Sequence, residues 1–195
     1  MGPLSDDLSR LGPADTEVVA SVQSFDARTL LQMALDRISS SRAWNAGDLL
    51  LVYLALSEPI DAEQTKSILE ALQQLDLSQF HEEQDFQLAC GVIARCGAST
   101  KDPAINLEAF DKLTDAWNSR ASTLNHYMAI MDAARKLCLG MGGVESFYNW
   151  WERTINASQR EIPSEALGLV AGLTWTAPLG YQSSLPSIRA KLLML

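Results

Sequence analysis

Side chains able to carry nucleophilic, acid–base or metal chemistry are scarce in this chain of 195 residues. It contains two histidines, His81 and His126, and three cysteines, Cys90, Cys96 and Cys138. The cysteines are odd in number, lack CxxC spacing and lie in apolar stretches, so we expect reduced, buried thiols in an intracellular, cytoplasmic compartment. A helical enzyme that uses Cys138 or His126 is kept as an alternative, although a buried structural cysteine is the more common case.

One segment carries half of a metal-binding motif. In His81-Glu82-Glu83-Gln84-Asp85, the histidine and Asp85 would be the metal ligands and Glu82 the base, as on the helix of a zinc peptidase. No third ligand is evident, and acidic residues in the first turn of a helix are stabilised by the helix dipole. We therefore predict a polar helix start and no metal site.

A glycine-rich segment, Gly140-Met141-Gly142-Gly143, is the nearest approach to a phosphate-binding loop. Glu145 stands where a dinucleotide-binding fingerprint needs its last glycine, and the residues before the segment have a helical pattern instead of a strand pattern. We interpret the segment as a turn between two helices. The sequence therefore predicts no cofactor and no catalytic residues, and the protein is expected not to be an enzyme.

Composition favours an all-α fold. Leu and Ala far outnumber Val and Ile, and 47% of residues are hydrophobic, which fits a folded globular protein. The pattern predicts about nine to ten helices, with a helix pair about every 38 residues. We expect a single all-helical domain over residues 14–195 after a flexible leader over residues 1–13, and the chain could be a fragment of a longer one. An irregular multi-helix bundle and a short armadillo-like or HEAT-like stack both fit.

Capping patterns predict where several helices begin and end. Predicted start signals are Asp26, Asn45, Asp61 with Gln64, and Asp102 followed by Pro103. Gly97 is predicted to end a helix that runs from about His81 to Cys96, with a loop over residues 97–102 after it. Further helices are expected over residues 144–155, 165–175 and 186–195.

The helix over residues 144–155 is the most distinctive, because it contains Phe147, Tyr148, Trp150 and Trp151. At about 100° per residue its apolar face spans about 160°, wider than a typical surface helix buries. We expect the helix to lie buried in a groove, with its indole N–H groups satisfied locally. The alternative is that Tyr148 or Trp150, at the edges of this face, binds a protein partner.

The net charge of −9 is concentrated in the middle of the chain. Residues 58–115 contain twelve acidic and four basic residues, a net charge of −8, whereas residues 116–195 have a net charge of +2. In the helices predicted for this part of the chain, six acidic residues lie outside the apolar faces: Glu82, Glu83, Asp85, Glu108, Asp111 and Asp115. They form either a solvated face or a docking surface for a basic partner.

We therefore predict a non-catalytic adaptor or scaffold module that uses an acidic helical face and an aromatic helix, with Tyr148, Trp150, Glu108, Asp111 and Asp115 as partner-binding residues. The alternative is an inhibitor or immunity-type protein that neutralises a basic enzyme.

A pI near 4.6 opposes nucleic-acid binding, because phosphates are neutralised by Lys and Arg. No membrane span is expected, since no apolar run is long enough. The C-terminal helices could support a homo-oligomer through Gly168 and Gly172, a small-x-x-x-small pair.

Overall fold

The computed structural model describes residues 26–56, 60–141 and 144–157, with side chains described except at 139–141, 144–145, 148, 152 and 155–157. In this part of the chain every regular element is helical, which confirms the predicted all-α class. The α-helices are α3 (Ala27–Ser41), α4 (Ala46–Ala55), α5 (Ala62–Gln74), α6 (Glu83–Thr100), α7 (Pro103–Asp115), α8 (Leu124–Met141) and α9 (Val144–Ala157). Two short elements join them: a 3-10 turn, η1 (Leu77–Gln79), and a π-helical segment, η2 (Ala116–Arg120).

The described residues thus form seven α-helices, and the expected count of nine to ten is not confirmed. The predicted leader over residues 1–13 and the helices predicted over residues 165–175 and 186–195 lie outside the described residues. So do Gly168 and Gly172, on which the expected homo-oligomer rests. None of the helices in the described part is both long and apolar enough to cross a membrane.

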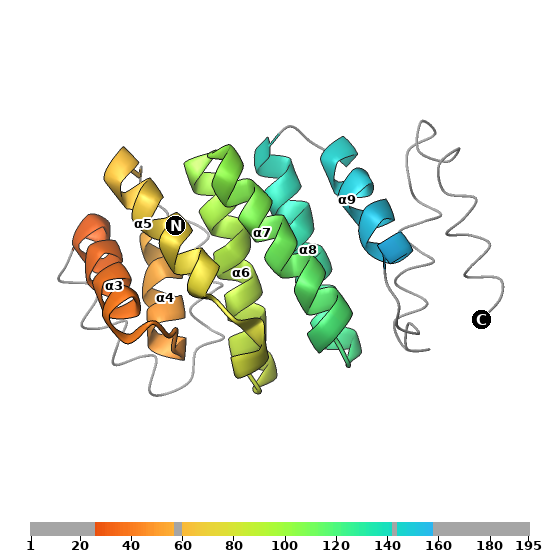
Figure 1. The fold of residues 1–195 in the computed structure, drawn as a ribbon, viewed down its shortest axis with the longest axis horizontal. Helices are drawn as coiled ribbons and strands as arrows, with labels where there is room; N and C mark the ends of the chain where they lie inside the picture. Colours follow the sequence, from red (N-terminus) through yellow and green to blue (C-terminus); the bar gives the residue numbers. More distant parts are fainter. Residues whose placement is uncertain (1–25, 57–59, 142–143, 158–195) are drawn as a thin grey trace, which may run out of the picture.

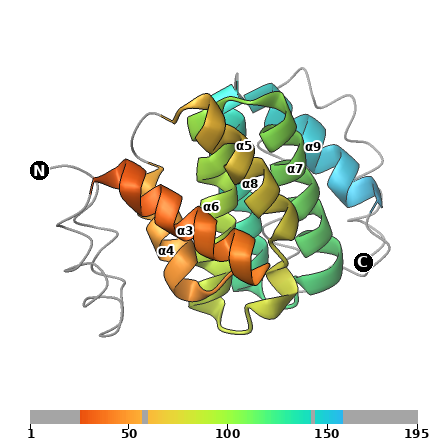
Figure 2. The same cartoon turned by 60° about the vertical axis from the view of Figure 1, so that its left-hand side comes forward.

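The first six helices alternate between two layers (Figures 1 and 2). Helices α3, α5 and α7 form the outer layer, and α4, α6 and α8 form the inner layer. Each helix packs against the next helix of its own layer, and α6 makes its most extensive contacts with α8. The pairs α3–α4, α5–α6 and α7–α8 begin 35 and 41 residues apart, near the predicted period of about 38.

The predicted helix starts are confirmed, because each cap is a local interaction. Asp26 accepts a hydrogen bond from the Thr29 amide at 2.9 Å, and Asn45 accepts one from the Asp48 amide at 2.9 Å. Asp61 and Gln64 form a capping box at the start of α5. At the start of α7, Asp102 accepts from the amides of Ala104 and Ile105, at 2.8 and 3.2 Å.

The predicted role of Gly97 is wrong. Helix α6 continues through Thr100, and Lys101, with a left-handed φ of 53°, ends it. Gly97 lies inside α6 at its contact with α7 and α8, where an added Cβ would stand 2.1 Å from Leu137 Cδ1 and 2.5 Å from Asn106 Oδ1. The glycine is therefore needed for close helix packing, and the loop expected over 97–102 shrinks to Lys101 and Asp102.

Polar links hold the two layers and neighbouring helices in register. The Asp48 carboxylate of α4, which is 1% exposed, pairs with Arg37 of α3. Between α4 and α6, Arg95 Nη1 donates to the Tyr53 carbonyl at 2.8 Å, and Ser99 Oγ donates to the Leu56 carbonyl at 2.9 Å. Both acceptors are carbonyls at the end of α4. The last carbonyls of a helix have no hydrogen-bond partner within the helix, and these two side chains supply one.

Candidate functional site

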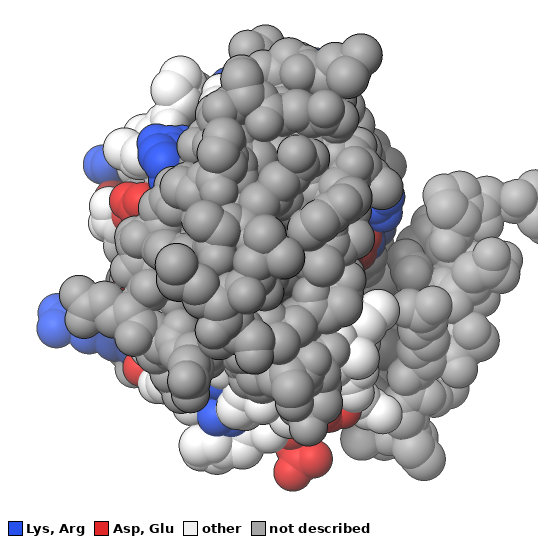
Figure 3. Space-filling model, turned by 90° about the vertical axis from the view of Figure 1, so that its right-hand side faces the viewer, with Lys and Arg blue, Asp and Glu red and all other residues white. Residues whose placement is uncertain are grey.

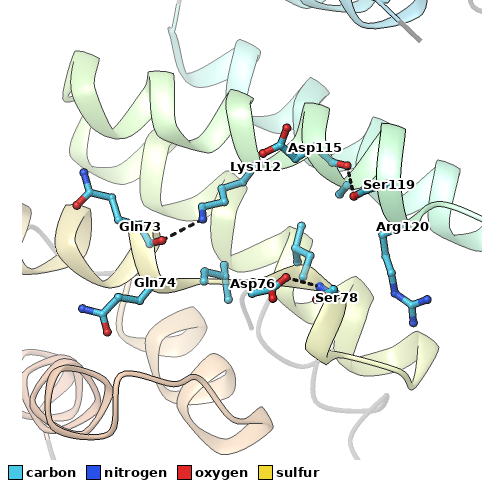
Figure 4. Close-up of a pocket in the computed structure, with 11 residues that line it drawn as sticks. Gln73, Gln74, Asp76, Ser78, Lys112, Asp115, Ser119 and Arg120 are labelled. Atoms are coloured by element: carbon cyan, nitrogen blue, oxygen red, sulfur yellow. Dashed lines mark hydrogen bonds between the residues drawn. The ribbon is translucent and has the colours of Figure 1, made fainter. Parts of the chain in front are cut away.

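A pocket of about 160 Å³ lies in the outer layer between the end of α5 and the end of α7 (Figure 4). Residues 73–78 form one wall, and the other wall is formed by side chains from the last turn of α7 and from η2. The pocket is lined mainly by polar side chains, and its lining includes two acidic and two basic residues: Asp76, Asp115, Lys112 and Arg120. This is the place in the described structure where charged side chains from two segments surround open volume.

The first wall is formed by the segment that follows α5, in which buried and exposed residues alternate. Leu75, Leu77 and Phe80 are buried in the core, which leaves Asp76 and Ser78 exposed at the pocket. Asp76 caps η1 by accepting a hydrogen bond from the Ser78 amide at 2.8 Å. Hydrogen bonds from the Ser78 side chain and amide lower the pKa of Asp76, and the nearby Lys112 ammonium adds to this effect. The Asp76 carboxylate is therefore ionised at neutral pH.

The second wall is formed where α7 passes into η2. The Ala121 amide donates to the Ala116 carbonyl at 2.8 Å, a bond across five residues that makes this turn wider than an α-helical one. Trp117 in this turn is buried, with its ring edge-on to Tyr127 at 4.5 Å between centroids. The wide turn thus keeps Trp117 in the core while Ser119 and Arg120 line the pocket.

The basic groups at the pocket are held by hydrogen bonds to backbone carbonyls. Lys112 points from α7 toward α5 and donates to the Gln73 carbonyl at 3.1 Å (Figure 4). Its Nζ also lies 3.7 Å from Glu108 Oε1. Arg120 Nη2 donates to the Phe80 carbonyl at 3.2 Å. The acidic and basic side chains that line the pocket suit it to binding charged groups.

The structure brings the predicted acidic residues of α7 together on its outward face. Glu108, Asp111 and Asp115 follow one another at spacings of three and four residues, which places them on one side of a helix. Asp111 and Asp115 are exposed, and the Glu108 side chain is 25% exposed beside Lys112. We call these three residues the acidic row. Asp115 also lines the pocket, so the row leads into it.

Glu83, another of the predicted acidic residues, lies away from the acidic row. Glu83 lies in the first turn of α6 and accepts hydrogen bonds from Thr123 Oγ1 at 3.3 Å and Asn125 Nδ2 at 2.8 Å. It therefore ties the start of α6 to the start of α8. Of the predicted acidic residues, Glu83 thus belongs to this junction and not to the acidic row.

Of the two predicted aromatic partner-binding residues, the structure describes the side chain of Trp150 alone. Trp150 is 3% exposed, and its Nε1 donates to Thr114 Oγ1 at 3.0 Å. Its ring lies near that of Phe110, 6.2 Å between centroids. For Trp150 this arrangement fits the expectation of a buried helix with a locally satisfied indole, and it leaves the residue little surface for a partner. For Trp151 the expectation is wrong, because its Nε1 is buried and has no hydrogen-bond partner among the described residues. Tyr148 is part of α9, but its side chain lies outside the described residues.

The cysteine thiols and the segment that contains His81 do not form a reactive or metal-binding site among the described residues. All three cysteines are buried and unpaired; burial raises the pKa of Cys96 and of Cys138 to about 12 and also raises the pKa of Cys90. They are therefore protonated at neutral pH. Helix α6 begins at Glu83, after His81, and among the described residues no group of three or more His, Cys, Asp or Glu side chains could hold a metal ion.

Sequence reasoning missed Asp76, Lys112 and Arg120 as pocket residues. A weak signal existed for Asp76, since an acidic residue two positions before a serine is a common turn-capping pattern. Lys112 and Arg120 carry no such signal, because their partners, the carbonyls of Gln73 and Phe80, lie 39 and 40 residues away in sequence.

The view onto the α9 end of the molecule shows described residues of both charge signs at its margin (Figure 3). The candidate site that the geometry favours among the described residues is the acidic row together with the pocket beside it. Comparison with known proteins found no matching family model, no matching curated protein and no matching solved structure.

Proposed function

We propose that this chain is a non-catalytic interaction module, an adaptor or scaffold, that binds a basic protein segment along α7. One observation carries the proposal: Asp115 belongs both to the acidic row and to the wall of the pocket that also holds Asp76. A line of carboxylates on an outer helix thus continues into a recess. A basic segment lying along α7 could place one Lys or Arg side chain in that recess.

Electrostatics decides what such a surface can do. A single exposed ion pair contributes about 0–1 kcal/mol, so no one carboxylate of the row suffices for binding. Several carboxylates together raise the association rate and select partners by charge. Leu107, which is 64% exposed and precedes Glu108 on α7, adds apolar contact area next to the row.

The layered fold supports the same proposal. Helix pairs that stack side by side present long, ordered surfaces, which is how helical-repeat proteins bind extended partners. We propose that the described pairs form a short stack of this kind, of the armadillo-like or HEAT-like type, because α3, α5 and α7 alternate with α4, α6 and α8.

Charge reversal tests the proposal. The triple variant Glu108→Lys, Asp111→Lys, Asp115→Lys is compared with wild type for binding of a fluorescent peptide rich in Arg and Leu, by anisotropy at low and high salt. We expect at least about a tenfold loss of affinity, since each reversal replaces an attraction by a repulsion of a few tenths of a kcal/mol or more.

A matched triple variant provides the control. Asp36→Lys, Glu63→Lys, Glu82→Lys changes three exposed acidic residues of α3, α5 and the segment before α6, and alters net charge by the same amount. It should keep most of the affinity. Equal losses in the two triple variants would show that the peptide responds to net charge alone, and would overturn the proposed docking site.

A further inference from the structure

His126 occupies a junction of three elements: the start of α6, the segment η2 and the first turn of α8. The residue is 5% exposed, and its ring lies against Phe86, with 4.6 Å between the ring centroids. Nδ1 lies 3.4 Å from the Ser122 amide nitrogen and 3.3 Å from Ser122 Oγ. On the other side of the ring, Nε2 is buried and has no hydrogen-bond partner.

The contact with the Ser122 amide favours the neutral imidazole. Accepting a hydrogen bond from the Ser122 amide requires a lone pair on Nδ1, so the proton is assigned to Nε2. Protonation would set an Nδ1–H against the Ser122 N–H and would place a positive charge in an apolar environment. It would also add a cation at the N-terminus of α8, where the helix dipole is positive.

The charged groups that face the imidazole come from the two neighbouring elements. Arg120 of η2 opposes protonation, whereas Glu83 of α6 favours it. Burial is the largest effect, and together with Arg120 it holds the pKa of His126 below its usual value of 6.5 in spite of Glu83. The folded protein therefore resists taking up a proton that the opened segment would accept.

We propose that His126 is a pH-sensitive latch, which keeps η2 and the start of α8 closed when neutral and releases them when protonated. The latch does not depend on the proposed docking of a basic partner, since it concerns only the opening of this junction. It does have a consequence for the pocket, because Ser119 and Arg120 of η2 line its wall.

The sign of the effect follows from the lowered pKa. Stability of the junction is complete above pH 6.5, the value at which the opened histidine titrates, and falls as the pH decreases from there toward the lower pKa of the closed state. If the closed state stays neutral, the opening equilibrium constant rises by as much as about tenfold between about pH 7.5 and about pH 5.5.

Hydrogen exchange of the full chain, read by mass spectrometry and corrected for the intrinsic pH dependence of exchange, tests the latch. We expect exchange in residues 116–127 to rise several-fold from neutral to mildly acidic pH, relative to residues in the middle of α6. In His126→Asn, whose amide oxygen can accept from Ser122 but cannot titrate, this rise should be lost. His81→Asn, which changes the other and exposed histidine, should behave like wild type.

Two results would overturn the proposal: a wild-type junction whose exchange is insensitive to pH in this range, or a His126→Asn variant that keeps the wild-type response. If His126→Asn does not fold, an NMR titration of wild type replaces it. The imidazole of His126 should then titrate below the usual histidine pKa of 6.5, and titration at or above that value would refute the latch.

Discussion

Helix α7 has two lateral contacts of opposite character. Toward α9, the Trp150 indole is buried beside Phe110 and donates to Thr114, an aromatic contact that leaves little exposed surface. Toward α5, the Lys112 ammonium reaches the Gln73 carbonyl across a pocket of about 160 Å³. The Trp150 contact to α7 is thus aromatic, whereas the Lys112 contact from α7 to α5 is made by a charged group at the edge of the packed helix pair.

The two contacts of α7 are expected to have different roles: the one with α9 stabilises the fold, and the one with α5 is available for binding. Apolar burial contributes roughly in proportion to the area removed from water, so the Trp150 contact stabilises the fold while leaving Trp150 itself little exposed surface. The Lys112 interaction contributes less, because its charge remains partly hydrated, and the open volume and ionised Asp76 beside it stay accessible. Variants on the two sides of α7 should therefore affect different measurements.

The largest expected effect is on the aromatic side. Trp150→Ala removes a buried indole and leaves a cavity, and should lower the free energy of unfolding by about 3–5 kcal/mol, measured by urea denaturation. Affinity of the remaining folded protein for the basic peptide should stay unchanged. Thr114→Val, which removes the hydrogen-bond acceptor of Trp150 and the hydroxyl that donates to the Phe110 carbonyl, should cost about 1 kcal/mol. A stable Trp150→Ala variant that no longer binds the peptide would instead make Trp150 a binding residue.

The inner side of α7 gives the next largest effect. Gly97→Ala would force a Cβ to within 2.1 Å of Leu137 Cδ1 and 2.5 Å of Asn106 Oδ1, so these two buried side chains must move or α6 must shift relative to α7 and α8. We expect a loss of about 1–3 kcal/mol in the free energy of unfolding, in spite of the better helix propensity of Ala.

Gly91→Ala in the same helix is the matched control, because its added Cβ meets only the edge of the Tyr53 ring, at 3.2 Å. It should cost much less than Gly97→Ala or be neutral. Equal costs for the two variants would mean that Gly97 is not selected for close packing at this crossing.

Features of the structure that depend on interactions between residues close in sequence could be predicted. The start of α5 could be predicted because Asp61 and Gln64 satisfy each other's backbone within three residues. The acidic row could be predicted because helical spacing alone places Glu108, Asp111 and Asp115 on one face. In both cases the cause lies within a few residues of the effect.

Features that depend on distant residues could not be predicted. Gly97 resembles a helix end in sequence, and only the positions of Asn106 and Leu137 show why a side chain is excluded there. A helical projection gives the width of the apolar face of α9, but the neighbour that covers Trp150 is Thr114, 36 residues earlier. The pocket likewise depends on the contact between α5 and α7, which no local pattern encodes.

The smallest stability effect is expected on the polar side of α7, and it also tests the comparison most sharply. Lys112→Met keeps the length of the side chain but removes its hydrogen bond to the Gln73 carbonyl, which water can replace at this partly exposed position. The free energy of unfolding should fall by about 1 kcal/mol or less. Because the variant also removes a positive charge beside Asp76 and Glu108, affinity for the basic peptide should rise, by a few-fold at low salt and less at high salt. Weaker binding in Lys112→Met would mean that the ammonium itself contacts the ligand, and the pocket would then select an acidic group instead of a basic one.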